Sequence, residues 1–193
     1  MLPVEELSVT TALDAILAEV ATTGAAISAS NGGSLDRAAE ALQGARRVFT
    51  LGAGRSGLAL NMTAMRLMHL GLTVHAVGEA TAPAIEEGDV LLVASGSGTT
   101  ESIVRAARKA REVGASTVAI TADGASVIAE LSDVTIIIPA ARKLDRDSAA
   151  SAQYAGGLFE QSVVIIGDAL FHALWKASGQ TADELWPRHS NLE

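Results

Sequence analysis

Five short β-rich segments, separated by longer stretches with helical spacing of apolar residues, constrain the fold most strongly. The segments are RVFTL near 47–51, TVHAV at 73–77, DVLLVAS at 89–95, STVAITA at 116–122 and DVTIIIP at 133–139. Four of the five are continuously apolar, as expected of parallel strands that are buried on both faces. Their alternation with helical stretches predicts an α/β fold, a three-layer α/β/α sandwich around a five-stranded parallel sheet.

Helical segments connect and flank these strands. Residues 58–71 and 101–114 carry apolar side chains at helical spacing, and each stretch ends at a glycine suited to a left-handed cap. The pattern predicts two helices within residues 10–45, separated by a turn at the NGG sequence of 31–33. Residues 153–179 have little polar surface and are predicted to form one long helix.

The length of 193 residues suits one domain with a substantial core. Within this single domain, 1–193, we expect N-terminal helices at about 10–45 and an α/β core at about 46–140. A C-terminal helix and tail are expected to follow at about 150–193.

Composition and charge argue against several classes of protein. The formal net charge of −8 and the few aromatic residues are unlike a nucleic-acid surface. The chain has no cysteine, and its four histidines form no metal-binding pair, so we expect no metal. We find neither a signal-peptide pattern at the start nor an uncharged apolar run of about 18 residues. The sequence therefore predicts a cytoplasmic enzyme or binding protein that does not act at a membrane.

A glycine-rich turn, GAGRSG at 52–57, follows the first predicted strand. Its glycines fit G-x-G-x-x-G, a pattern that places a dinucleotide pyrophosphate on a helix N-terminus. A dinucleotide fold also needs an acidic residue about 20 positions later, at the end of the second strand. Glu79 is a poor match because it follows that strand after Gly78. The alternative is a strand-to-helix turn that needs glycine only for tight packing.

A second loop follows the third predicted strand and precedes a helix. Its hydroxyl groups and glycines belong to Ser95, Gly96, Ser97, Gly98, Thr99 and Thr100. The glycines let backbone N–H groups converge at a helix N-terminus, where the helix dipole favours negative charge. This composition predicts a site for one compact phosphate, with a hydroxyl-rich helix cap that binds no ligand as the alternative.

These two loops resemble the phosphosugar-binding loops of the sugar isomerase (SIS) domain family. The stretches AMRLMHLG, SAQYAGGLFEQ and RHSNLE resemble its 6-phospho-3-hexuloisomerase branch, and the likeness extends from about residue 10 to the end. This resemblance implies a flavodoxin-like topology and the reversible conversion of D-arabino-3-hexulose 6-phosphate to D-fructose 6-phosphate. It also implies a place in formaldehyde fixation by the ribulose monophosphate route, with no cofactor.

The resemblance also implies roles for particular residues. Ser56 of the first loop and residues 95–100 of the second loop would bind substrate, and Glu160 of the FEQ sequence would be the catalytic base. Two further candidates rest on their positions in the sequence and not on the resemblance. Arg55, inside the first loop, is a candidate contact for phosphate or substrate hydroxyls, with a plain surface charge as the alternative. His189 is a candidate proton shuttle in its own or a neighbouring subunit, with a solvated histidine in a pinned tail as the alternative.

The expected chemistry can be examined on its own terms. A carbonyl that moves by one carbon through an enediol needs a base that takes a proton from carbon 2 and returns it to carbon 3. Glu160 suits this role because apolar residues surround it in the sequence. The alternative is a glutamate that only stabilises the start of a helix through the helix dipole.

Three further features are open to two interpretations. Arg66 and His69 lie three residues apart on one predicted helix and either face the site or, for His69, pack in a core or interface. The polar segment 141–151 is either a mobile cover over the substrate or a plain connecting loop.

The terminal helices are rich in alanine, valine and isoleucine, which predicts a homo-oligomer, a dimer or a tetramer, with sites near the subunit interfaces. Two rival functions stay open. One is a phosphosugar-binding module without catalysis, as in some transcription regulators, although the residues before Val48 are too few for their helix-turn-helix domain. The other is an isomerase of the same fold that acts on arabinose 5-phosphate or sedoheptulose 7-phosphate.

Overall fold

The computed structural model describes residues 8–139, 151–154 and 157–192. Its centre is a parallel sheet with the strand order β2-β1-β3-β4-β5. The strands are β1 (Val48–Gly52), β2 (Val74–Ala76), β3 (Val90–Ala94), β4 (Ser116–Thr121) and β5 (Val134–Ile137). All five predicted strands are confirmed, and the flavodoxin-like order places the carboxyl ends of the central strands β1 and β3 side by side.

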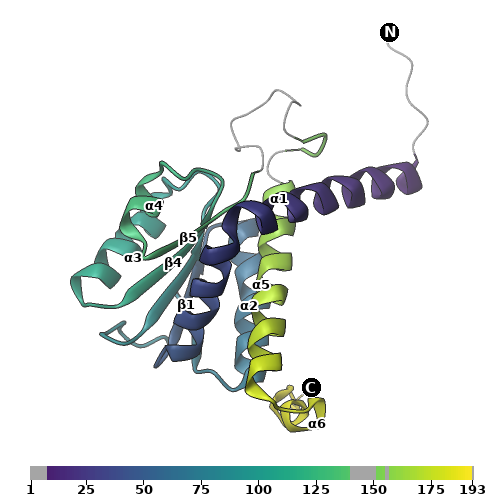
Figure 1. Ribbon diagram of the computed structural model, residues 1–193. Coiled ribbons are helices and arrows are strands. Elements are labelled where there is room, and N and C mark those ends of the chain that lie inside the picture. Colours follow the sequence, from purple (N-terminus) through teal and green to yellow (C-terminus); the bar gives the residue numbers. More distant parts are fainter. Residues whose placement is uncertain (1–7, 140–150, 155–156, 193) are drawn as a thin grey trace.

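Helices cover both faces of this sheet (Figure 1). One face carries α1 (Val9–Gly44), α2 (Arg55–Leu70) and α5 (Gly157–Ser178), and the other carries α3 (Glu101–Glu112) and α4 (Val127–Leu131). The chain continues after α5 into α6 (Ala182–Leu185) and a 3₁₀ turn (Trp186–Arg188). The predicted three-layer α/β/α sandwich is therefore confirmed.

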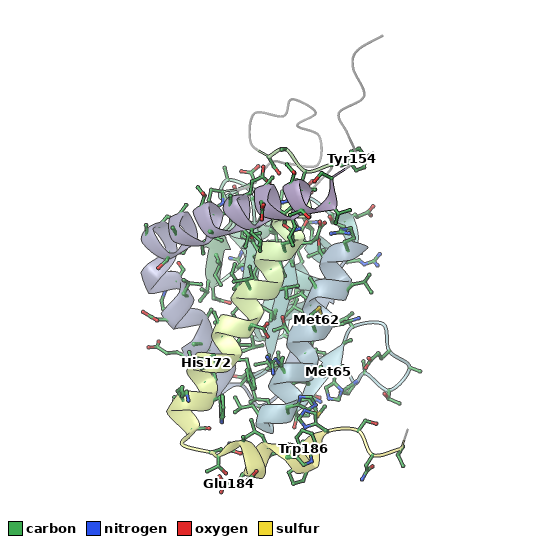
Figure 2. All side chains as sticks on the ribbon, turned by 90° about the vertical axis from the view of Figure 1, so that its right-hand side faces the viewer. Met62, Met65, Tyr154, His172, Glu184 and Trp186 are labelled. Carbon is green, nitrogen blue, oxygen red and sulfur yellow. The ribbon has the colours of Figure 1, made fainter. Side chains whose placement is uncertain are left out.

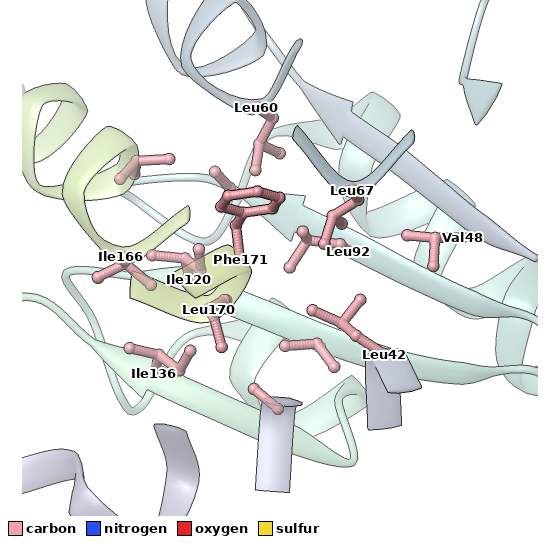
Figure 3. Close-up of a cluster of buried hydrophobic side chains, with 14 of the residues drawn as sticks. Leu42, Val48, Leu60, Leu67, Leu92, Ile120, Ile136, Ile166, Leu170 and Phe171 are labelled. Atoms are coloured by element: carbon pink, nitrogen blue, oxygen red, sulfur yellow. The ribbon is translucent and has the colours of Figure 1, made fainter. Parts of the chain in front are cut away.

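The strands are apolar throughout because both faces of the sheet are buried. Successive side chains of a strand point to opposite faces. On β3, Leu92 joins the large cluster under α1, α2 and α5 (Figure 3), whereas Leu91 and Val93 join the smaller cluster under α3 and α4. Ile166 of α5 lies in the large cluster (Figure 3), so the sheet holds this helix in place.

The prediction of two helices within residues 10–45 is wrong, because α1 is one helix of 36 residues. The buried amide of Asn31 donates to the Ile137 carbonyl at 2.7 Å and accepts from the Ile137 N–H at 2.8 Å. Asn31 of the NGG sequence thus hydrogen-bonds to the edge strand β5 from within a helix. Figure 1 shows that α1 bends and that its first half projects beyond the sheet. Paired glycines, here Gly32 and Gly33, are a common cause of such a bend.

The last long helix starts later than predicted, at Gly157 rather than near residue 153. Residues 151–154 are not helical, and side chains at their start bond to α1. By length and composition, α1 and α5 could each cross a membrane when up to two charges are allowed. The apolar window of α5 is 56% buried, as in a core helix, whereas that of α1 is 11% buried.

Candidate functional site

A cavity lies where the turn after β1, the loop after β3 and the start of α5 meet. It encloses about 90 Å³. Its lining comprises Ala53, Ser56, Ala94, Ser95, Gly96, Ser97, Thr100, Ile103, Phe159 and Glu160. Both predicted loops and the predicted base therefore meet in one place, at the carboxyl edge of the sheet, where ligands bind in open α/β folds.

The first loop turns tightly from β1 into α2. A Cβ atom on Gly52 would lie 2.7 Å from the backbone nitrogen of Gly57, so neither position has room for a side chain. Gly54 has a φ of +58°, a conformation that side chains disfavour. Packing and backbone geometry thus account for all three glycines. This agrees with the interpretation that the G-x-G-x-x-G pattern serves tight packing of the turn. The turn leaves Ser56 buried and lining the cavity.

The second loop is held by its own hydroxyl groups. The Ser95 hydroxyl lies 3.1 Å from that of Thr100 and accepts a hydrogen bond from the Gly98 N–H at 3.2 Å. Gly98 has a φ of +62°, and a Cβ atom there would clash with the Ser126 hydroxyl. The position of Gly98 therefore has no room for a side chain, and Ser126 packs directly against the loop.

The second loop leaves the N-terminus of α3 without a side-chain cap. Thr100 is the N-cap residue, but its hydroxyl faces Ser95, and no side-chain cap bond forms at this helix. Ser95, Gly96, Ser97 and Thr100 line the cavity, whereas Gly98 is buried behind the loop and Thr99 is exposed. The arrangement suits an anion, because hydroxyls and a helix N-terminus point at one small space.

Glu160 lies in the first turn of α5 and is 6% exposed. Its carboxylate accepts a hydrogen bond from Arg55 Nε at 3.2 Å, and the Arg55 side chain is 66% exposed. Phe159 packs beside Gly96, at 3.6 Å from the position of a Cβ atom there. Glu160, a buried residue with a cationic partner, thus lines the same cavity as the second loop and the apolar Phe159. Arg55 pairs with the proposed base and does not line the cavity.

His189 lies far from Glu160 within the chain. Its ring stacks on that of buried His69 with centroids 4.0 Å apart, and Trp186 packs against it at 4.7 Å. Burial lowers the pKa of His69, and the neighbouring charges of His189 and Arg66 lower it further. Since His69 and Ser56 lie at opposite ends of α2, about 20 Å separates them along the helix. The structure brings His189 to the wrong end of α2 for catalysis in its own chain.

The remaining candidates have structural partners. Arg66 pairs with Asp168 at 3.0 Å and lies over the Phe171 ring, on the outside of α2. His69 packs in the buried end of α2, as the packing interpretation holds. The predicted cover at 141–151 lies outside the described residues except for Ser151. Among the residues that the structure describes, no cluster of three histidine, aspartate or glutamate side chains could bind a metal ion.

Sequence reasoning did not identify Phe159 and Ile103 as walls of the cavity, or Ser126 as the support of the phosphate loop. Phe159 had a usable signal, because it directly precedes the proposed base. Ser126 had none, since only the folded chain brings it to Gly98. The Arg55–Glu160 ion pair was also unforeseen, because 105 residues separate its members.

Comparison with known proteins identifies the family. Residues 41–155 match the SIS domain family model. The chain is 55% identical to a 3-hexulose-6-phosphate isomerase of Mycobacterium gastri over 76% of its own length and 74% of the relative's. It is 36% identical to the enzyme of that name from Bacillus subtilis, over 82% of this chain and 86% of the relative.

A solved structure from Methanococcus jannaschii, for which a 3-hexulose-6-phosphate isomerase function was inferred, is also similar. Its TM-score is 0.80 and its identity 30%, over 95% of this chain and 99% of that one. The family match spans more than half of the chain, and the similar solved structure shares the fold. The chain therefore belongs to the SIS domain family.

Proposed function

We propose that this protein is an isomerase that interconverts D-arabino-3-hexulose 6-phosphate and D-fructose 6-phosphate. The observation that carries the proposal is the buried Glu160 carboxylate facing a hydroxyl-lined helix N-terminus in one cavity. A phosphate and a base at opposite walls are what a keto sugar phosphate needs for this reaction. The 55% identical relative bears the name of this activity. A module that only binds phosphosugars would not need the buried carboxylate.

In the proposed reaction, Glu160 takes the proton from carbon 2 of the 3-keto sugar. The electron pair forms the double bond of a 2,3-enediol, and the carbonyl oxygen on carbon 3 gains a proton. Glu160 then returns its proton to carbon 3 while the carbon 2 hydroxyl loses one, which leaves the carbonyl at carbon 2. Arg55 stays beside the carboxylate and offsets part of the cost of burying it. His189 is proposed to move the oxygen-bound proton.

The phosphate is proposed to bind at the loop after β3. Hydroxyls of Ser95, Ser97 and Thr100, with the uncapped N–H groups of α3, would donate hydrogen bonds to its oxygens. Ser56 would contact the phosphate or a neighbouring hydroxyl of the sugar. Among the described residues, no lysine or arginine lines this cavity. Hydrogen bonds from the loop and the dipole of α3 would therefore provide the attraction for the phosphate.

A second subunit is proposed to complete the site. Leu58, Met62, Met65 and Met68 form an exposed apolar stripe along α2, which we call the α2 stripe. Figure 2 shows Met62 and Met65 on the open face of this helix, with Trp186 at its far end. The stripe runs from the Glu160 end of α2 to the His189 end. Antiparallel pairing of two α2 helices about a two-fold axis would place His189 of one chain near Glu160 of the other.

The size of the cavity agrees with this arrangement. Its volume of about 90 Å³ is below the roughly 300 Å³ at the lower end of ligand pockets, so one chain encloses only part of a sugar phosphate. The projecting half of α1 carries a separate apolar stripe, Val9, Leu13 and Leu17. Two separate stripes provide two interfaces, and we therefore propose a homotetramer.

The proposal includes a cytoplasmic location, with α1 buried by another subunit rather than by a membrane. It also includes the ribulose monophosphate route of formaldehyde fixation, in which a 3-hexulose 6-phosphate must be converted to fructose 6-phosphate.

Fructose 6-phosphate should raise the melting temperature, whereas NAD and NADP should not. At a ligand concentration 100 times Kd, binding adds about 2.7 kcal/mol, which corresponds to about 5–10 °C for a chain of this size. Differential scanning fluorimetry with each compound checks this expectation. Thr100→Val removes one hydroxyl at similar volume and should reduce the shift, while unphosphorylated fructose should give none. A shift with NAD alone would restore the dinucleotide interpretation.

A further inference from the structure

The segment that leads into α5 is tied to the projecting half of α1 by one carboxylate. Glu19 accepts hydrogen bonds from the Ser151 hydroxyl at 2.9 Å, the Ala152 N–H at 2.6 Å and the Gln153 amide at 3.0 Å. More than 130 residues separate Glu19 from Ala152 and Gln153. The Ala152 N–H, followed by the Gln153 amide, holds the pKa of Glu19 below its usual range. Glu19 is therefore an ionised acceptor with three partners.

The tie continues from Gln153 into α5. Gln153 Nε2 donates to Gln161 Oε1 at 3.0 Å, and Gln161 Nε2 donates back to Gln153 Oε1 at 2.9 Å. A primary amide has two N–H donors, and those of Gln153 have acceptors on Glu19 and on Gln161. Gln153 also lies against Gly157, the first residue of α5, where a Cβ atom would be 3.0 Å from its oxygen.

Gln161 directly follows Glu160 in the first turns of α5. The bonds thus form a continuous connection from Glu19 through Gln153 and Gln161 to the turn that carries the proposed base. The first turn of a helix lacks part of its own hydrogen-bond ladder and frays easily. Hydrogen bonds from outside the helix to this turn therefore restrict the motion of the Glu160 carboxylate. Catalysis depends strongly on such positioning.

We propose that Glu19 is a positioning residue, which fixes the start of α5, and with it the Glu160 carboxylate, through the Gln153–Gln161 amide pair. Its role in turnover rests on the proposed function, whereas its role in ordering the helix does not. In the proposed function the phosphate binds on the loop after β3, and Glu19 does not line that cavity. We therefore expect the chemical step to depend on Glu19 more than the affinity does.

The test uses Glu19→Gln in the full-length protein. Glutamine offers one acceptor oxygen where the carboxylate offers two, and its NH₂ group would face the donors of the 151–153 segment. We expect kcat to fall by about 10- to 100-fold, the range for a small misplacement, with KM within about threefold. Amide hydrogen exchange should become faster in the first turns of α5 and stay unchanged in α3.

Asp14→Asn is the matched control, because it removes a negative charge from the same half of α1 at a side chain for which the described part of the chain shows no hydrogen bond. It should leave both readouts unchanged. Glu19→Asp keeps the charge and should recover part of the kcat that Glu19→Gln loses. Unchanged exchange at the start of α5 in a folded Glu19→Gln protein would overturn the proposal. Faster exchange together with native turnover would limit Glu19 to folding and overturn its positioning role.

Discussion

Glu160→Gln should lower turnover by about 100- to 10,000-fold, the usual contribution of a general base, while the affinity for sugar phosphate barely changes. Glutamine has the size of glutamate and can still accept the Arg55 hydrogen bond, but it cannot take a proton from carbon. The loop after β3, which is proposed to hold the phosphate, is untouched. Steady-state kinetics give the change in kcat, and titration of fructose 6-phosphate gives the affinity.

Asp168→Asn is the matched control for this variant. Asp168 lies on the same helix, and its exposed ion pair with Arg66 is of the kind that contributes little to stability. Its turnover should stay near native. In heavy water the native enzyme should place solvent deuterium on carbon 3 of fructose 6-phosphate, and Glu160→Gln should do so far more slowly. If Glu160→Gln kept more than about a tenth of native turnover, another residue would be the base.

Mixing two nearly inactive variants should restore activity if His189 serves the site of a partner subunit. Glu160→Gln and His189→Ala should each lose about 100-fold or more of turnover. In a mixed pair, one site has two defects, and the other has an intact Glu160 and receives an intact His189. Random exchange of subunits should therefore recover about a quarter of native activity in a two-fold assembly. Co-expression of the two variants, followed by the isomerase assay on the unfractionated mixture, measures this recovery. Mixed pairs isolated with two affinity tags should show about half of native activity.

Two variants control the mixing experiment. His172→Ala removes an exposed histidine from the outside of α5 and should be nearly native without a partner. Met65→Glu places a charge in the middle of the α2 stripe and should dissociate the homo-oligomer, which light scattering would detect. When Met65→Glu is added to both inactive variants, mixing them should restore no activity. Absence of recovery between well-assembled variants would show that His189 does not act across the interface.

The strands, and the position of the hydroxyl-rich loop at the cavity, were predictable because their signals are local. Continuous apolar runs mark buried parallel strands, and glycines at 71 and 114 do adopt the positive φ expected after a helix. The hydroxyls of residues 95–100 were visible in the sequence, and most of them line the cavity.

Features that depend on distant contacts could not be predicted. Nothing near Asn31 in the sequence shows that its amide pairs with Ile137 at the sheet edge. The glycine pair therefore predicts a turn, although it lies inside a helix. Glu19 and Gln153 likewise meet only in the fold. His189 and Glu160 are far apart because they lie near opposite ends of α2. No local sequence motif shows that either residue packs against that helix.

The most direct test of the proposed function is a coupled assay with enzymatically supplied D-arabino-3-hexulose 6-phosphate, read as formation of fructose 6-phosphate. Arabinose 5-phosphate and sedoheptulose 7-phosphate serve as parallel substrates. We expect a kcat of about 1–1,000 s⁻¹ on the hexulose phosphate, the usual range for enzymes, and a kcat/KM at least about 100-fold above that for either other sugar. No turnover of the hexulose phosphate, or a higher kcat/KM for another sugar phosphate, would contradict the proposed function.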